Sequence, residues 1–137
     1  MTTDKRPKLK EISEERCWQL LGQKQIGRLA VSINNQPDVF PVNYRIDNQM
    51  VFIRSAAGIK LAAAVLGTSV AFEVDAIDEE TETGWSVVVR GTASELSNLD
   101  DQLFAEDLHI TPWASGPKER FVQIVPTVIT GREVPLE

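Results

Sequence analysis

Cysteine, histidine and long apolar runs are scarce in this chain of 137 residues, which has one cysteine, Cys17, and one histidine, His109. One cysteine excludes an intramolecular disulfide, and one histidine excludes a zinc site built from several histidines. No apolar run approaches the roughly 20 residues of a transmembrane helix, and the polar stretch Met1–Lys10 lacks the pattern of a secretory signal. We therefore expect a soluble, cytoplasmic protein without a membrane partner.

The sequence motifs of many common enzymes are also absent. There is no Gly-x-Ser-x-Gly nucleophile elbow, no HExxH metal motif, and no GxGxxG or P-loop motif for a nucleotide phosphate. A catalytic pair of Cys17 and His109 is conceivable, but Cys17 falls on the apolar face of a predicted helix, which favours a buried structural cysteine. Most hydrolytic and metal chemistry is therefore excluded.

Positive charge is in short supply. Lys and Arg number 14 against 20 Asp and Glu, which gives a net charge of −6. A protein with this balance lacks the broad basic surface that binds duplex nucleic acid, so we expect no nucleic-acid partner. The basic cluster Lys5–Lys10 is interpreted as a solvated tail. The acidic run Asp75–Glu82 is interpreted as a solvated turn, because it lacks the spacing of an EF-hand calcium loop.

The length of the chain fits a single domain, which we place at residues 12–137 after a flexible lead-in at residues 1–11. The domain begins with a short predicted helix. Ser13 is its expected N-cap, two acidic residues follow in the first turn, and Gly22 ends it.

Alternation of apolar and polar residues dominates the rest of the sequence. It predicts strands over Ile26–Ile33, Val39–Ile46, Met50–Arg54, Ser69–Asp78, Trp85–Leu96, Phe121–Val125 and Val128–Val134. Short helices are expected over Ile59–Leu66 and Leu99–Leu108, and a loop over Ile110–Lys118. Six or seven short strands, mostly linked by hairpins, predict a mainly β protein, an antiparallel barrel with two or three short helices.

Three positions in the predicted strands interrupt the regular pattern. Pro41 has no N–H group for a strand ladder, which indicates a sheet edge, a bulge, or backbone used for something other than pairing. Gly91 is expected at a bulge or bend of the longest strand. Pro126 is expected to break the last part of the chain into two strands.

The residues around Arg54 have the composition of a phosphate site. Arg54 ends a predicted strand, Ser55 follows it, and Lys60 lies in the first turn of the next predicted helix, after Gly58. A guanidinium, a hydroxyl, an ammonium group and the N–H groups of a helix N-terminus can together bind a terminal phosphate. The alternative is that Arg54 pairs with a nearby carboxylate and that Lys60 is a solvated helix residue.

Two further segments have a composition suited to ligand binding. The apolar face of Phe40–Tyr44, with the interruption at Pro41, suits a flat heteroaromatic ring whose edge needs backbone partners, although an ordinary barrel strand has the same pattern. In the second segment, Trp85–Arg90, the side chains of Ser86 and Arg90 share one face. Arg90 is then either directed at an anion or a plain surface charge.

Four segments occur in this order along the chain: Gly27–Ala30, Phe40–Tyr44, Phe52–Leu61 and Gly84–Gly91. Together they resemble the pyridoxamine 5′-phosphate oxidase-like family of flavin-binding split barrels, in particular its short bacterial members, which include nitroimidazole-reductase-like proteins. The resemblance extends over Ser13–Val134, nearly the whole chain. It implies a six-stranded antiparallel Greek-key split β-barrel of the FMN-binding type, and a homodimer with two FMN sites at the subunit interface.

The resemblance also implies which residues contact the cofactor. The phosphate and ribityl chain would be surrounded by Arg54, Ser55, Lys60 and Leu61. The isoalloxazine ring would be lined by Phe40, Pro41, Val42 and Asn43. The partner subunit would contribute Trp85, Ser86 and Arg90, and the loop that contains His109 and Trp113 would complete the pocket, with Trp113 as a cofactor contact.

The function implied by the resemblance is that of an FMN-dependent oxidoreductase. Hydride would pass from a reduced nicotinamide through the flavin to a small electron-poor acceptor, and no side chain would act as the catalytic nucleophile. Oxidation of vitamin B6 is not expected, because no Arg-x-His element can be placed and His109 stands far from a matching arginine.

Three alternatives remain within this fold. A reductase that uses the deazaflavin F420 would need more basic groups beside the pocket, for which Arg28, Arg45 and Arg90 are available. A protein that carries flavin or haem without catalysis is the second alternative. The third is a structural barrel dimer whose pocket binds no cofactor.

Overall fold

The computed structural model describes residues 4–55, 68–96, 98–110 and 120–135. Its strands are β1 (Lys10–Ile12), β2 (Ile26–Ile33), β3 (Gln36–Asp47), β4 (Met50–Ser55), β5 (Ser69–Asp78), β6 (Thr83–Glu95) and β7 (Arg120–Val134), and its helices are α1 (Glu14–Leu21) and α3 (Leu99–Asp107). The helix expected over Ile59–Leu66 and most of the loop expected over Ile110–Lys118 lie outside the described residues.

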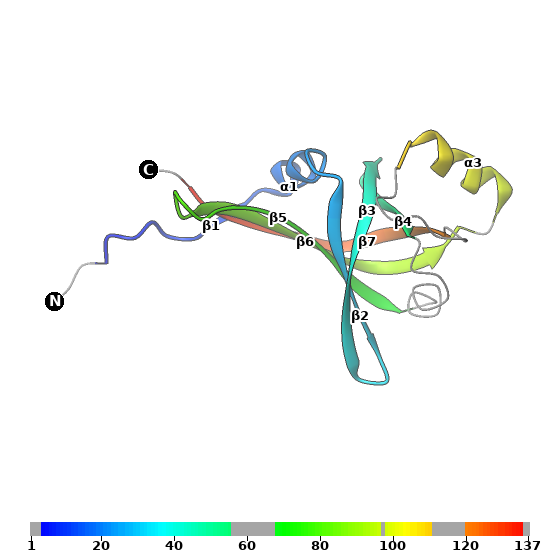
Figure 1. Ribbon diagram of the computed structural model, residues 1–137, viewed down its shortest axis with the longest axis horizontal. Helices are drawn as coiled ribbons and strands as arrows, with labels where there is room; N and C mark the ends of the chain where they lie inside the picture. The colour runs from blue at the N-terminus through cyan, green and yellow to red at the C-terminus, as the bar shows by residue number, and fades with distance from the viewer. Residues whose placement is uncertain (1–3, 56–67, 97, 111–119, 136–137) are drawn as a thin grey trace.

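Six antiparallel strands close into a ring, in the order β7–β4–β3–β2–β5–β6 and back to β7 (Figure 1). This confirms the predicted mainly β barrel. β1 is added to the free edge of β7 through Lys10–Ile12, so the expected lead-in ends in a short strand that the sequence pattern did not reveal. A segment of three residues is too short for an alternation to be recognised.

Strand β7 runs through the whole molecule and is not broken at Pro126, contrary to the prediction. It pairs with β6 from Val122 to Val134, and a register shift beside Gly91 accommodates the proline. A Cβ atom at Gly91 would overlap the Val125 carbonyl, and the Thr127 hydroxyl donates to the Arg90 carbonyl at 3.1 Å. The bulge expected at Gly91 is therefore confirmed, and it allows one strand to continue where two were expected.

The barrel interior holds the main core. Its largest fully buried side chains include Leu29, Tyr44, Ile53, Phe72, Val87, Val89 and Ile124. Of these, Leu29, Tyr44, Phe72 and Val87 lie on the strand faces that the predicted alternation assigned to them. Helix α1 packs against this core through its three buried residues, Cys17, Leu20 and Leu21. The Tyr44 hydroxyl donates to the Leu21 carbonyl at 2.5 Å and so ties the helix to the barrel.

The local signals at α1 and at the acidic turn are confirmed. The Ser13 hydroxyl accepts from the Arg16 N–H at 3.2 Å, as an N-cap does. The Asp78 carboxylate accepts from the N–H groups of Glu80 and Thr81, so the acidic run forms a hydrogen-bonded surface turn from Asp78 onward, whereas Asp75 lies within β5. Within the described residues there is no helix with the length and apolar character of a membrane span, and no group of potential metal ligands.

A second, smaller core lies outside the barrel. Helix α3 covers the outer faces of β4 and β7 with a cluster formed by Phe52, Leu96, Ala105, Ile110 and Phe121. It lies far from α1 and from both ends of the chain (Figure 1). This packing determines the surroundings of Arg54, which is on the same outer face of β4.

Candidate functional site

Arg54 occupies the outer face of β4, in one cross-strand row with Asn43 of β3 and Phe121 of β7. Its guanidinium carbon lies 5.1 Å from the centre of the Phe121 ring, and its Nη1 donates to the Ile110 carbonyl at 3.2 Å. Nη2 lies 3.8 Å from a carboxylate oxygen of Glu106 on α3. The side chain is 21% exposed, so the guanidinium is held in one place and still reaches solvent.

The contact with Glu106 agrees with the alternative given for the sequence, in which Arg54 pairs with a nearby carboxylate. It is a weak pairing, because the atoms are 3.8 Å apart and the Glu106 side chain is 53% exposed. A phosphate would make shorter, bidentate contacts with the same guanidinium. Pairing with Glu106 and a role in phosphate binding are therefore compatible for Arg54.

The other residues predicted near the phosphate are not all described. Ser55 is the last residue of β4, where its backbone pairs with Arg120. Lys60 and Leu61 lie outside the described residues, as does Trp113. Their predicted roles stay predictions from the sequence.

Strand β3 presents alternate residues of Phe40–Asn43 to opposite sides of the barrel. Val42 is 4% exposed and belongs to the inner core, and Phe40 packs partly against it. Pro41 and Asn43 are on the outer face, the same face as Arg54. Any ring outside the barrel would thus meet the side chains of Pro41 and Asn43, and only the backbone of Phe40 and Val42.

The first half of β3 is also an edge of the described sheet. From Gln36 to Val42 it pairs with β2, whereas its pairing with β4 begins only at Asn43. Among the described strands, none covers the other side of this stretch. Its N–H and C=O groups are suited to hydrogen-bond the edge of a flat ligand, as the interruption at Pro41 indicated.

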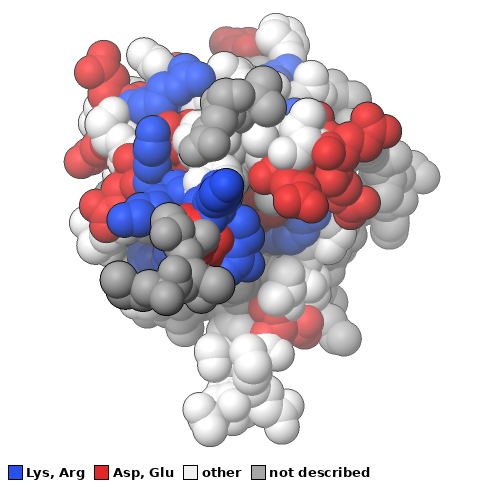
Figure 2. Space-filling model, turned by 90° about the vertical axis from the view of Figure 1, so that its left-hand side faces the viewer, with Lys and Arg blue, Asp and Glu red and all other residues white. Residues whose placement is uncertain are grey.

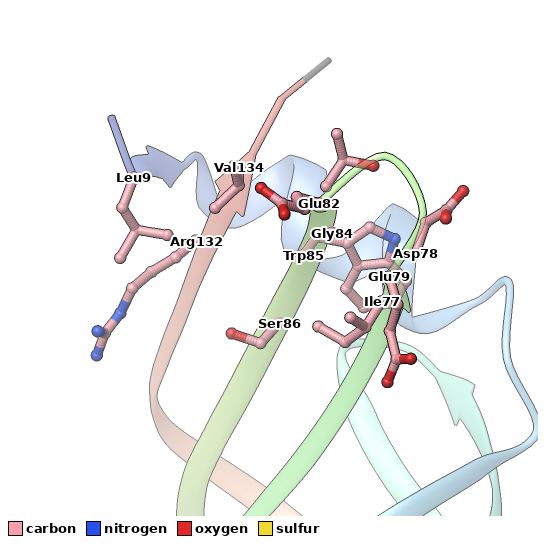
Figure 3. A pocket seen from close by; sticks show the side chains of 11 residues that line it. Leu9, Ile77, Asp78, Glu79, Glu82, Gly84, Trp85, Ser86, Arg132 and Val134 are labelled. Atoms are coloured by element: carbon pink, nitrogen blue, oxygen red, sulfur yellow. The ribbon is translucent and has the colours of Figure 1, made fainter. Parts of the chain in front are cut away.

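Trp85 and Ser86 line a different part of the surface, a mainly apolar hollow of about 430 Å³ between β5, β6 and the end of β7 (Figure 3). Ile77, Trp85 and Val134 form apolar walls. The side chains of Asp78, Glu79 and Glu82 belong to the turn at one side, and that of Arg132 lies at the other. The hollow is suited to a flat apolar group with a polar edge.

The two groups of predicted residues are far apart within one chain. Arg54 pairs with Phe121 near the beginning of β7, whereas Trp85 pairs with Glu133 near its end. The intervening part of β7 has a length of roughly 40 Å. The structure brings Pro41, Asn43 and Arg54 to one outer face, but it does not bring Trp85 and Ser86 to them. Within the described part of one chain, the two groups therefore do not form a single site.

An ionic cluster beside Pro41 was not recognised in the sequence. Arg28, the cross-strand neighbour of Pro41, has its Nη1 3.4 Å from carboxylate oxygens of both Glu73 and Asp75. Burial raises the pKa of Glu73 to about 7, and the hydrogen bond and charge of Asp75 act in the same direction against the attraction of Arg28. Acidic residues two apart on one strand share a face, which is the signal that could have revealed the pair.

The two side chains that could have acted as a nucleophile and base are not placed together. Cys17 is fully buried beside Gly131, and burial, followed by the charge of Glu14, raises the pKa of its thiol. His109 is exposed just after α3, in a left-handed conformation with φ of 54°. The interpretation of Cys17 as a structural residue is confirmed.

Comparison with known proteins shows similarity along almost the whole chain. The family model of pyridoxamine 5′-phosphate oxidase matches residues 13–133. The Rv0080 protein of Mycobacterium tuberculosis is 31% identical over 126 residues, which are 88% of this chain and 82% of that protein.

Two solved structures are similar in fold and sequence. The FAD binding protein from Mycobacterium smegmatis has a TM-score of 0.81 and 35% identity, over 93% of this chain and all of the other. A FAD-binding protein from Mesorhizobium loti has a TM-score of 0.78 and 25% identity, over 93% of this chain and 99% of the other. These similarities confirm the split-barrel fold expected from the sequence.

Proposed function

This chain belongs to the pyridoxamine 5′-phosphate oxidase family, and we propose that it is a flavoprotein that holds its flavin between two copies of the chain. The observation that carries the proposal is the position of the predicted cofactor residues. Pro41, Asn43 and Arg54 share one outer face, and Trp85 with Ser86 lines an apolar hollow at the other end of β7. In a homodimer, the first group of one copy and the second group of its partner would form one site.

The described residues fit a flavin with a phosphate. The Arg54 guanidinium is stacked on Phe121 and fixed by the Ile110 carbonyl, so it can bind an anion with little loss of side-chain freedom. The backbone of Gln36–Val42, which no described strand pairs with on its second side, would hydrogen-bond the edge of the ring. Ser55, Lys60 and Leu61 would complete the phosphate end, and Trp113 the ring end, as the sequence predicts.

The sequence motifs favour FMN as the cofactor, and FAD is the first alternative to test. The similar proteins from Mycobacterium smegmatis and Mesorhizobium loti are FAD-binding proteins. F420 is less favoured on structural grounds, because Arg28, one of the three cations available for it, is engaged by Glu73 and Asp75. Haem remains the alternative of a different chemical class.

The proposed reaction is transfer of hydride from a reduced nicotinamide to a small electron-poor acceptor. A bound flavin supplies the redox chemistry, and the chain supplies position and electrostatics. The Arg54 guanidinium would offset the phosphate charge in an acidic protein, and Pro41 and Asn43 would limit access of water to one face of the ring. The buried Cys17 takes no part in this reaction.

The visible absorption spectrum of the purified protein tests this proposal. We expect a flavin band, at about one flavin per chain, after addition of FMN or FAD and removal of the excess. Turnover of a reduced nicotinamide with nitroaromatic or quinone acceptors then tests the oxidoreductase activity. Retention of flavin without turnover would identify a carrier, and failure to take up FMN or FAD would overturn the flavin assignment and lead to tests of F420 and haem.

A further inference from the structure

A pair of acidic residues lies on the outer face of the barrel, beside the part of the proposed flavin site that contains Pro41. Arg28 of β2 is opposite Pro41, and Glu73 of β5 is opposite Arg28, so the three residues form one cross-strand row. Leu29 and Phe72, which follow and precede members of this row in the sequence, are fully buried, so the row itself faces outward. Adjacent strands are about 5 Å apart, which puts the backbone of Glu73 about 10 Å from that of Pro41.

Arg28 holds the two acids together. Its Nη1 lies 3.4 Å from Oε1 of Glu73 and 3.4 Å from Oδ2 of Asp75, which is two residues further along the same face of β5. One guanidinium therefore faces two carboxyl groups. When both acids are ionised, one negative charge of this cluster is not compensated, and a proton on one of the carboxyl groups removes that charge.

The strand on the other side of the pair supplies little compensation. The residue of β6 opposite Glu73 is the apolar Val88, and the next charged residue on that face of β6, Arg90, is opposite Ala71. Among the described residues, Arg28 is the one cation within 4 Å of Glu73 or Asp75. The excess negative charge of the cluster is therefore a property of its immediate surroundings.

Glu73 and Asp75 are also less hydrated than the acids of the neighbouring turn. The end of the molecule where β5 turns into β6 displays exposed acidic side chains (Figure 2), whereas the side chains of Glu73 and Asp75 are 33% and 26% exposed. Burial, followed by the hydrogen bond and the charge of Asp75, raises the pKa of Glu73 to about 7, against the opposing effect of Arg28. A carboxyl group with such a pKa can hold a proton near neutral pH and still release it readily.

The proposed reaction consumes one proton in each turnover. A reduced nicotinamide gives up a hydride, which carries two electrons, and leaves as the oxidised nicotinamide. A quinone acceptor needs this hydride and one proton to become a hydroquinone. The proton must come from a group at the site or from water, and a carboxyl group on the face that holds the ring is suited to supply it.

We propose that the carboxyl group of Glu73 donates the proton that the acceptor takes up together with the hydride. This inference rests on the proposed function, which places the flavin ring on the outer face at Pro41. The O–H bond of Glu73 breaks as the acceptor oxygen binds the proton, and the electron pair of that bond stays on the carboxylate. The exposed part of Glu73 then takes a new proton from water. Arg28 and Asp75 are positioning residues, which orient the carboxyl group and set its proton affinity.

The rate at which a quinone reoxidises the reduced, flavin-loaded protein tests this role, measured by stopped flow at several pH values. In the wild type we expect the rate to decrease as the pH rises through the pKa of Glu73, about 7, because the donor loses its proton. Glu73→Gln should be about a hundredfold slower at low pH, as loss of a general acid is, and should lack this decrease. Glu15→Gln is the control, since it removes an exposed acid of α1 outside the cluster.

Two neighbouring variants separate proton donation from a structural role of the cluster. Asp75→Asn removes groups that raise the pKa of Glu73, so the midpoint of the pH profile should move to lower pH. Arg28→Gln removes a group that lowers the pKa, so the midpoint should move to higher pH. A structural role alone would not produce shifts of opposite sign. Midpoints that stay at the wild-type pH in both variants would contradict the proposal, even if Glu73→Gln does not fold.

A titration of the flavin-free protein gives a readout that does not depend on activity. In ¹³C NMR spectra of the side-chain carboxyl groups, we expect one glutamate signal to titrate near neutral pH in the wild type. This signal should be missing in Glu73→Gln and should titrate at lower pH in Asp75→Asn. A wild type in which no carboxyl group titrates near neutral pH would exclude Glu73 as the donor.

Failure of this inference is distinguishable from failure of the proposed function. Retention of flavin, together with the same rate and pH profile in the wild type and Glu73→Gln, would remove the proton donor and leave the flavoprotein. A wild type that takes up no flavin would overturn the proposed function and, with it, the role of Glu73 as donor.

Discussion

Three of the neighbours that restrain Arg54 differ in chemistry, namely the Phe121 ring, the Ile110 carbonyl and the Glu106 carboxylate. Two of them contact the guanidinium without neutralising its charge. The third is exposed and distant enough to be displaced. This combination is suited to an anion-binding arginine, since the group is oriented in advance and remains charged.

Arg54→Ala is expected to weaken flavin binding by about 1.5–3 kcal/mol, the range for a hydrogen bond to a charged group. Fluorescence titration of the apoprotein with FMN and FAD measures the effect. Glu106→Gln is the control, because it removes the carboxylate and leaves the guanidinium in place. Unchanged flavin affinity in Arg54→Ala, or an equal loss in Glu106→Gln, would contradict the assignment of Arg54 to the phosphate.

Glu73 is expected to make stability depend on pH. Its pKa rises from 4.5 to about 7 in the folded protein, so between these values the folded state holds a proton that the unfolded state has lost. The free energy of unfolding therefore decreases as the pH rises through this window and levels off above it. A third of the Glu73 side chain is exposed, which limits the change to about 1 kcal/mol.

Urea unfolding at several pH values between 4.5 and 8 measures this dependence. Glu73→Gln should flatten the decrease, because the variant has no proton to lose at this position. Glu79→Gln, which removes an exposed acid of the turn after β5, should leave the decrease as it is in the wild type. The same slope in the wild type and Glu73→Gln would show that other groups cause it.

At the scale of the elements, the pairing of β6 with β7 depends on one glycine. The two strands approach closely at the bulge, where a Cβ atom on Gly91 would meet the backbone of Val125 and Pro126. Backbone cannot move aside as the end of a long side chain can. The bulge therefore requires glycine for space, not for an unusual φ angle.

Gly91→Ala is expected to lower the free energy of unfolding by about 1–3 kcal/mol, as overpacking does. Gly22→Ala is the matched control. There a Cβ atom would meet the Gln19 carbonyl at 3.5 Å, an ordinary contact, and the φ of −68° suits alanine. We expect that variant to be neutral or slightly stabilised. Urea unfolding measures the free energy of unfolding of both variants. Equal values for Gly91→Ala and Gly22→Ala would refute the close approach of β6 and β7 at Gly91.

At the scale of the whole molecule, the length of β7 separates the two parts of the proposed flavin site. Its beginning lies opposite the β4 residues that include Arg54, and its end lies opposite Trp85 of β6. The strand between them is roughly 40 Å long along its path, which is well beyond the reach of a side chain. In the proposed homodimer, the Arg54 part of one copy would meet the Trp85 part of its partner. The two-fold axis would make two such sites per dimer.

Mixed dimers of two inactive variants test this arrangement. Arg54→Ala and Trp85→Ala are each expected to weaken flavin binding at both sites of their own dimers, and binding capacity is measured at a flavin concentration that fills only intact sites. After co-expression, half of the dimers carry one copy of each, and such a dimer has one intact site, so about a quarter of the wild-type capacity should return. The control is a mixture of the Arg54→Ala and Asn43→Ala variants. Both changes affect the same part of the site, so a dimer with one copy of each has no intact site. Absence of recovery in the first mixture would refute a site shared between copies.

The alternation of apolar and polar residues was sufficient to predict most of the barrel. In β2, β3 and β6 the residues with period two face the core as expected, because the direction of a strand side chain depends only on its position in that strand. The N-cap at Ser13 and the turn at Asp78 were equally predictable, since each depends on hydrogen bonds within a few residues.

The order of the motifs identified the family and indicated the residues of the candidate site. It also led to the expectation that Trp85, Ser86 and Arg90 come from a partner. The position of Trp85 and Ser86 at the far end of β7 from Arg54 supports that expectation for these two residues, and it stays a proposal until the mixed dimers are measured. The motifs name Phe40 and Val42 as ring contacts, but both side chains pack on the core side of β3, so only their backbone faces a ring outside the barrel.

The sequence by itself determined the class of the fold, the faces of its strands and the family, because each depends on a local pattern or on the order of short segments. The tertiary structure decided where Arg54 finds its partners, how β7 passes Pro126, and that Arg28 meets Glu73 and Asp75. These features depend on which residues of distant segments lie opposite one another. That register is set when the barrel closes, and no single stretch of the chain contains it.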